Sequence, residues 1–241
     1  MPQGWPEHAS GHGYPRPQLR RKQWQPLNGV WDFAFDLPGR WTHPDEVAFD
    51  RRIQVPFAPE TPASGLHATG AFRACWYRTR IAAPRRPPGG HLRLHFGAVD
   101  WAATVWINGL RAAYHEGGYT PFSIDLTALA RDAAEYEIVV HAEDDPLDLR
   151  MPRGKQTWQP TPGSIWYPRT SGIWQTVWLE PVPAAWIESL QWTPDLERWE
   201  LGLEAFLGGE VRDDLRLSLE LRAGPQVLAR DTYHVLAGEV H

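Results

Sequence analysis

Hydrophobic and polar residues alternate with a period of two along much of this chain. In VWDFAF (30–35) the aromatic residues share one face, and in LRLHF (92–96) the leucines and Phe96 do the same. FSIDL (122–126) repeats the pattern, whereas helical periodicity is nearly absent. Because side chains of a strand point alternately to its two faces, these segments predict half-buried strands of antiparallel sheets.

Turn residues separate the predicted strands. The chain contains 23 prolines and 21 glycines, which fall mostly between the alternating segments. In VWINGLRAA (105–113) the pair Asn108-Gly109 tolerates positive φ and predicts a tight type I′ hairpin. The fold class predicted is therefore all-β, a β-sandwich of the jelly-roll kind.

A second unit is predicted after EPVPAAW (180–186), whose prolines and small residues are typical of a short linker. Beyond it the loops shorten, and leucine recurs at every second position from Leu215 to Leu221. Residues 186–241 hold about four or five predicted strands, fewer than the ~7 of an immunoglobulin-like sandwich. We therefore expect the chain to stop inside a domain, with exposed strand edges that favour a homo-oligomer.

Composition narrows the classes of partner. The 24 basic and 29 acidic residues leave a net charge of −5, and no basic stripe indicates a nucleic-acid partner. No run approaches the ~20 apolar residues of a membrane span, and no signal sequence opens the chain, so a cytoplasmic protein is expected. The single Cys75 fits a reducing compartment and is interpreted as a small buried hydrophobe. Fourteen tryptophans hint at recognition, although most should lie in the core.

Five blocks of sequence, taken in their order along the chain, are typical of a known protein family. They are QPLNGVWDFAFD (25–36), VPFAPE (55–60), CWYRTR (75–80), FGAVDWAATVWINGLRAAYHEGGYTPFSIDLT (96–127) and PRGKQTWQPTPGSIWYPRTSGIWQTVWLEPV (152–182). Together they resemble the amino-terminal part of glycoside hydrolase family 2, which includes β-galactosidases, β-glucuronidases and β-mannosidases. The resemblance implies a flexible segment at 1–14, a galactose-binding-like jelly roll at 15–182 and a partial immunoglobulin-like β-sandwich at 183–241.

The same resemblance places catalysis outside this chain. In such enzymes two catalytic glutamates lie in a TIM barrel, which takes about 250 residues by itself. The chain has no room for a barrel and lacks the Asn-Glu dipeptide that marks the family's acid/base. We therefore predict no catalytic residue here, no cofactor, and no hydrolysis of glycosides by the chain alone.

The aspartates of HAEDDPLDLRMPRGK (141–155) could suggest a cation site. No EF-hand glycine or terminal glutamate accompanies them, and three basic residues follow closely. A solvated, ion-paired loop is the preferred interpretation, and a metal site is not predicted.

Two loops carry the candidate carbohydrate-binding residues. In PRGKQTW, Arg153, Lys155, Gln156 and Trp158 place hydrogen-bond donors beside an aromatic ring, as sugar recognition requires. The alternative is a loop that packs against another domain, and the two are compatible.

In IWYPRTSGIWQTVWLE (165–180), alternation predicts a strand from Ser171 to Glu180, whereas 165–170 is predicted as loop because Pro168 bars a central strand. The loop contributes Trp166, Tyr167 and Arg169 to the predicted sugar site. The resemblance implies an aspartate where this chain has Trp166, so the identity of the sugar stays open.

Three functions are compatible with the sequence. The first is the non-catalytic front of a family 2 glycosidase, which would brace the catalytic TIM-barrel domain, its partner, and form part of a pocket for a β-glycoside. The second is a free-standing carbohydrate-binding module. The third is a structural β-sandwich that mediates assembly.

Overall fold

The computed structural model describes residues 13–130, 133–148, 150–157, 159 and 161–235. These residues form two compact units. The first comprises 13–15, 21–86 and 91–181, and the second comprises 16–20, 87–90 and the chain from Val182 onward. Helix is confined to α1 (Leu126–Ala130) and to 3₁₀ turns at Pro17–Leu19, Pro44–Glu46 and Pro62–Ser64 among the described residues. The predicted all-β fold is confirmed.

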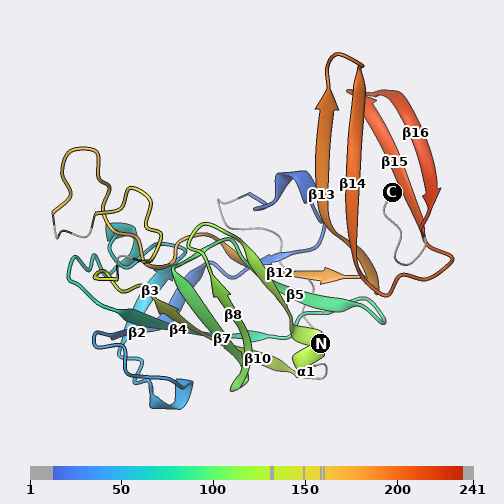
Figure 1. Cartoon of the computed structure of the whole chain (residues 1–241). Coiled ribbons are helices and arrows are strands. Elements are labelled where there is room, and N and C mark those ends of the chain that lie inside the picture. The colour runs from blue at the N-terminus through green and yellow to red at the C-terminus, as the bar shows by residue number, and fades with distance from the viewer. Residues whose placement is uncertain (1–12, 131–132, 149, 158, 160, 236–241) are drawn as a thin grey trace. The chain divides into compact units, whose positions relative to one another are not determined.

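The first unit contains two large antiparallel sheets (Figure 1). The six-stranded sheet has the order β3 (Arg51–Val55), β2 (Gly29–Asp36), β4 (Ala74–Ala82), β10 (Glu135–Glu143), β7 (Ala102–Ile107) and β8 (Leu110–Glu116). The four-stranded sheet has the order β1 (Gln25–Pro26), β12 (Val177–Val182), β5 (His91–Phe96) and β9 (Phe122–Asp125). A short pair, β11 (Gly172–Ile173) with β6 (Val99–Asp100), completes the unit.

The hydrophobic core draws on both large sheets. From the six-stranded sheet it takes Trp31 and Phe33, and from the four-stranded sheet it takes Leu92, Leu94 and Phe96, all of which are buried. The alternation read from the sequence therefore identified the inward faces of β2 and β5 correctly. Cys75 is buried in the same core, as predicted, and burial raises the pKa of its thiol.

The Asn108-Gly109 turn joins β7 to β8 as predicted. Asn108 has φ of 49° and Gly109 has φ of 79°, the two positive values that a type I′ turn requires. This turn suits the twist of antiparallel neighbours, so it fixes β7 beside β8 in the six-stranded sheet.

The prediction of a single strand from Ser171 to Glu180 is wrong in one respect, because the chain leaves the extended conformation between β11 and β12. Within β12, Val177 and Leu179 enter the core while Trp178 and Glu180 occupy the opposite face. That face is also buried. The Glu180 carboxylate accepts hydrogen bonds of 2.8 Å from Arg21 Nε and 2.8 Å from Trp178 Nε1.

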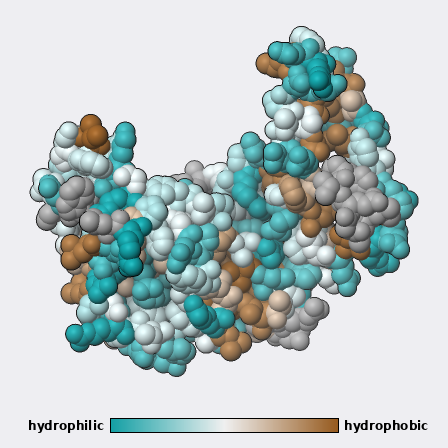
Figure 2. Space-filling model, viewed as in Figure 1, coloured by the Kyte–Doolittle hydropathy of each residue, from teal (hydrophilic) through white to brown (hydrophobic). Residues whose placement is uncertain are grey.

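The second unit contains two β-hairpins. β13 (Ala185–Asp195) pairs with β14 (Glu200–Gly209), and β15 (Arg216–Ala223) pairs with β16 (Gln226–His234). Figure 2 shows hydrophobic side chains at the surface among these strands. The exposed large apolar residues of the unit are Trp192, Leu196, Trp199, Leu201, Phe206, Leu221, Val227, Leu228 and Tyr233. Across the part of the chain that the structure describes, no helix has the length and apolar character needed to cross a membrane.

Candidate functional site

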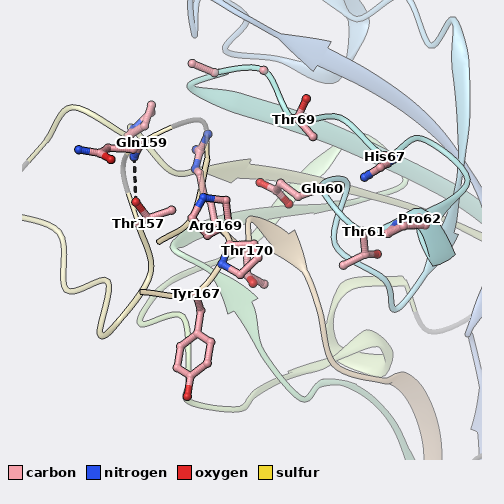
Figure 3. Close-up of a pocket in the computed structure, with 15 residues that line it drawn as sticks. Glu60, Thr61, Pro62, His67, Thr69, Thr157, Gln159, Tyr167, Arg169 and Thr170 are labelled. Carbon is pink, nitrogen blue, oxygen red and sulfur yellow. Dashed lines mark hydrogen bonds between the residues drawn. The ribbon is translucent and has the colours of Figure 1, made fainter. Parts of the chain in front are cut away.

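Two connecting segments of the first unit enclose a cavity of about 510 Å³ (Figure 3). One segment lies between β3 and β4, and the other is the long connection from β10 to β11. The lining residues are Glu60, Thr61, Pro62, His67, Thr69, Gly70, Ala71, Pro146, Thr157, Gln159, Pro162, Tyr167, Pro168, Arg169 and Thr170. A cavity of this size, lined by both apolar and polar groups, can hold a sugar ring.

Arg169 joins the two segments. Its Nε donates to Asp144 Oδ2 at 2.9 Å, and its Nη2 donates to the carbonyl oxygens of Phe72, at 3.0 Å, and Asp144. The guanidinium also lies over the ring of Phe72, with Cζ 4.7 Å from the ring centroid. Since both charged side chains are mostly buried, 14% and 17% exposed, this ion pair fixes the loops far more firmly than a surface pair would.

Ser171 extends the same network to Glu60. The Ser171 hydroxyl donates to Asp144 Oδ2 at 2.8 Å, and the Ser171 amide donates to Glu60 Oε2 at 3.2 Å. Glu60 Oε1 is buried and has no hydrogen-bond partner among the described residues. Desolvation raises the pKa of the Glu60 carboxyl, so this group holds a proton more readily than an exposed glutamate.

Gln156 anchors the middle of the long connection. Its Nε2 donates to Asp100 Oδ2 at 2.7 Å and to the Tyr119 hydroxyl at 3.1 Å, and its Oε1 accepts the Thr170 amide at 2.6 Å. All of the hydrogen-bonding atoms of this buried amide are thus engaged within the protein. The connection is held by a side chain rather than by a regular sheet.

Comparison with known proteins gives partial matches. No family model matches the chain. β-Glucuronidase of Canis lupus familiaris is 30% identical over 136 residues, which is 49% of this chain and 20% of that protein. A β-galactosidase of Thermoanaerobacter pseudethanolicus is 28% identical over 155 residues, 64% of this chain and 19% of that protein. The chain thus spans about a fifth of the length of such relatives.

Solved structures match over most of the chain. Bifidobacterium dentium β-glucuronidase, complexed with coumarin-3-O-glucuronide, has a TM-score of 0.65 and 20% identity over 89% of this chain and 40% of that one. A family 2 β-galacturonidase of Eisenbergiella tayi, bound to glycerol, has a TM-score of 0.60 and 20% identity over 92% of this chain and 36% of that one. The resemblance to glycoside hydrolase family 2 is confirmed. At these identities the structural matches show the shared fold.

The candidate carbohydrate-binding residues predicted from the sequence do not all meet at the cavity. Tyr167 and Arg169 line the cavity, and Tyr167 is 63% exposed with its ring pointing away from the other labelled side chains of Figure 3. Lys155 is exposed, and Trp166 is 39% exposed beside the cavity without lining it. Arg153 donates to the carbonyl oxygens of Pro146, at 3.4 Å, and Asp148, at 3.3 Å. Trp158 lies outside the described residues.

The ion pairing predicted for the aspartate-rich loop is confirmed. The pairs are Asp144 with Arg169, Asp145 with Arg73 and Asp148 with Arg150, with nitrogen–oxygen distances of 2.9, 2.8 and 2.7 Å. The prediction of a solvated loop overestimated the exposure of these aspartates, because their side chains are only 17–20% exposed. Among the residues that the structure describes, no group of three or more His, Cys, Asp or Glu could hold a metal ion.

Sequence reasoning missed the acidic groups that organise the cavity. Glu60 belongs to VPFAPE, one of the blocks that carry the family 2 resemblance, but nothing local distinguishes its carboxyl as a cavity residue. Asp100 stands between the hydrophobic residues Val99 and Trp101, and only the fold brings it to Gln156. No local sequence pattern identifies either carboxyl as part of the site.

Asp100 gives the first unit a predictable pH dependence. Burial raises the pKa of this carboxyl from 3.8 to about 7. The folded state therefore holds the proton more tightly than the unfolded state, and the stability that Asp100 contributes falls as the pH rises from about 4 to 7. We expect Asp100→Asn to be more stable than the wild type by roughly 2 kcal/mol at pH 8 and about equal to it at pH 4. Urea denaturation at both pH values measures this, and an Asn variant that loses stability at pH 8 would contradict it.

Proposed function

We propose that this chain is the non-catalytic amino-terminal region of a family 2 glycoside hydrolase, and that its loops form one wall of the pocket for a β-glycoside. The observation that carries the proposal is the 510 Å³ cavity, whose loops are tied together by the Arg169–Asp144–Ser171 network. Such preorganisation is what a wall of a binding pocket requires, because loops that are already ordered lose little entropy on binding. The relatives support the class of substrate, since they are named β-glucuronidases and β-galactosidases.

Within this proposal the side chains have different roles. Tyr167, Trp166 and Lys155 are exposed at or beside the cavity and would face the sugar or a neighbouring catalytic domain. Arg169 and Gln156 donate to groups of the protein itself, so they act as positioning residues. Arg153 likewise holds the segment after β10.

The proposed domain organisation follows the two units. The first unit would be the sugar-binding jelly roll, at about 15–182, and the second an immunoglobulin-like β-sandwich, from 183. The four described strands of the second unit form two hairpins with many exposed apolar side chains. Further strands packed on these hairpins would bury that surface. The catalytic TIM barrel would then be a partner of the first unit.

The test is to assay the 241-residue chain and the product of the complete open reading frame side by side, using 4-nitrophenyl β-glucuronide, β-galactoside and β-mannoside. We expect turnover only from a product that extends beyond these residues. Tyr167→Ala in that product should raise KM more than it lowers kcat, since the wall binds the sugar and supplies no catalytic group. Turnover by the purified 241-residue chain would contradict the proposal.

A free-standing carbohydrate-binding module is the second candidate. It is favoured by Trp166 and Tyr167, two large aromatic side chains that remain exposed next to the cavity. This candidate predicts saturable binding of a β-glycoside by the chain alone, lost in Trp166→Ala. A flat calorimetric titration with the three nitrophenyl glycosides and the corresponding free sugars would argue against it.

A further inference from the structure

The outer face of the six-stranded sheet carries a second groove. It has a volume of about 420 Å³ and shares no lining residue with the loop cavity. Its lining residues are Gly39, Trp41, Thr42, His43, Thr104, Trp106, Gly109, Arg111, His141 and Glu143. They come from β7, β8, the turn between these two strands, β10, and the loop between β2 and β3, which lies below β2 in Figure 1.

Aromatic rings form the floor of this groove. Trp76 stacks on Trp106, with ring centroids 5.2 Å apart, and on His141, with centroids 4.2 Å apart. Strand pairing produces this arrangement, since Trp76 of β4 is opposite His141 of β10, which is opposite Thr104 of β7. These side chains therefore lie in one row on the face that points away from the main core.

The loop that forms the groove's wall is preorganised. The Asp36 carboxylate accepts the amides of Arg40 at 3.0 Å and Trp41 at 2.8 Å. Further along, Glu46 Oε2 accepts the amides of Thr42 at 2.7 Å and His43 at 3.3 Å, closing a capping box at the 3₁₀ turn.

Trp41 also packs against the aromatic floor, so its indole is held at the edge of the groove. Because this side chain is already fixed, less conformational entropy is lost when a ligand binds against it.

The polar groups of the groove suit a ligand rich in hydroxyls. Arg111 is exposed and makes no ion pair among the described residues, although its guanidinium lies 5.8 Å from the ring centroid of Tyr114. The Glu143 carboxylate lies 4.0 Å from His141 Nδ1.

Burial lowers the pKa of His141 to about 4, so this imidazole is neutral at pH 7. One guanidinium, one carboxyl group and the Thr104 hydroxyl then offer donors and acceptors with almost no net charge.

We propose that this groove binds a neutral oligosaccharide, with the indole of Trp41 against a sugar ring and with Arg111 and Glu143 hydrogen-bonded to hydroxyls. An anionic ligand would meet the Glu143 carboxyl, and a purely apolar one would leave Arg111 and Glu143 without partners. The site is additional to the loop cavity and does not depend on the proposed pocket wall. It would hold the protein on a polysaccharide at a distance from the bond to be cleaved.

The test titrates the 241-residue chain with cellohexaose, xylohexaose, laminarihexaose and maltohexaose, and with hexagalacturonate as an acidic probe. Calorimetry should give a Kd of about 0.1–1 mM for at least one neutral hexaose and weaker binding of hexagalacturonate. Trp41→Ala should weaken the binding about tenfold and Arg111→Gln several-fold, as the loss of a stacked ring and of a charged donor predicts. Because Arg111 is exposed, its variant keeps the test valid if Trp41→Ala fails to fold.

Two controls locate the binding. Trp199→Ala removes a tryptophan that is 92% exposed in the second unit and should leave the affinity unchanged. Tyr167→Ala alters the loop cavity, so affinity that is lost in this variant and kept in Trp41→Ala and Arg111→Gln would place the binding in that cavity instead of the groove. The proposal is overturned if no neutral hexaose binds, if hexagalacturonate binds best, or if affinity is lost in Tyr167→Ala and kept in Trp41→Ala and Arg111→Gln.

Discussion

Replacing Arg169 with methionine is expected to lower the free energy of unfolding by about 3–5 kcal/mol, the usual cost of breaking a buried ion pair. Methionine fills much of the same space, but it leaves the Asp144 carboxylate mostly buried with the Ser171 hydroxyl as its remaining side-chain donor among the described residues. The carbonyl of Phe72 also loses the donor that it receives from Arg169. The loops around the cavity should therefore loosen together, because one guanidinium is hydrogen-bonded to both segments.

Arg73→Met is the matched control. Arg73 forms a pair of similar length with the neighbouring Asp145, at 2.8 Å, but its side chain is 59% exposed. Exposed pairs contribute about 0–1 kcal/mol, so this variant should unfold almost as the wild type does. Urea denaturation followed by tryptophan fluorescence measures both variants. Equal losses for Arg169→Met and Arg73→Met would mean that burial does not strengthen the Asp144 pair.

The strands of the first unit could be predicted because their signal is local. A period of two needs only neighbouring residues, and the positive φ of Asn108 and Gly109 depends on the two residues themselves. The non-strand character of 165–170 was equally local, since Pro168 lacks an amide hydrogen. The break between β11 and β12 was missed, because Trp174 to Thr176 continue an alternating pattern while leaving the sheet.

The contacts that organise the cavity could not be predicted in the same way. Ser171 and Glu60 are 111 residues apart in the chain, and Gln156 and Asp100 are 56 apart. Which carboxyl meets which donor depends on how strands from distant segments are ordered in the sheets, and no local pattern encodes that order. Arg169 was identified from its loop, but its role changed once Asp144 and Phe72 were found beside it.

The groove on the outer face of the six-stranded sheet also depends on the order of the strands. Trp76, Trp106 and His141 lie on the face opposite the core side chains of their own strands. Their stacking requires the order β4-β10-β7, which brings residues of three separate segments side by side. The groove forms where these side chains meet the ordered loop that carries Trp41.

Gly172→Ala is expected to destabilise the first unit by about 3–4 kcal/mol, through backbone strain and overlap with a neighbouring side chain. Gly172 has φ of +69°, a left-handed value that alanine adopts with strain. An added Cβ would lie 2.9 Å from Tyr77 Cζ and closer still to the hydroxyl oxygen. Tyr77 is fully buried and cannot move aside. The displacement would pass to Ser171, the neighbour that hydrogen-bonds both Asp144 and Glu60.

Two further variants separate the strain from the overlap. Gly65 has φ of +82°, and an added Cβ there would meet nothing within 4 Å, so Gly65→Ala should cost only about 1 kcal/mol. Tyr77→Phe removes the hydroxyl that Gly172→Ala would strike, at the expense of the acceptor for the Ile173 amide. In a double-mutant cycle, Gly172→Ala should therefore cost at least about 1 kcal/mol less in the Tyr77→Phe background than in the wild type. Strict additivity would show that the hydroxyl of Tyr77 does not limit the space at position 172.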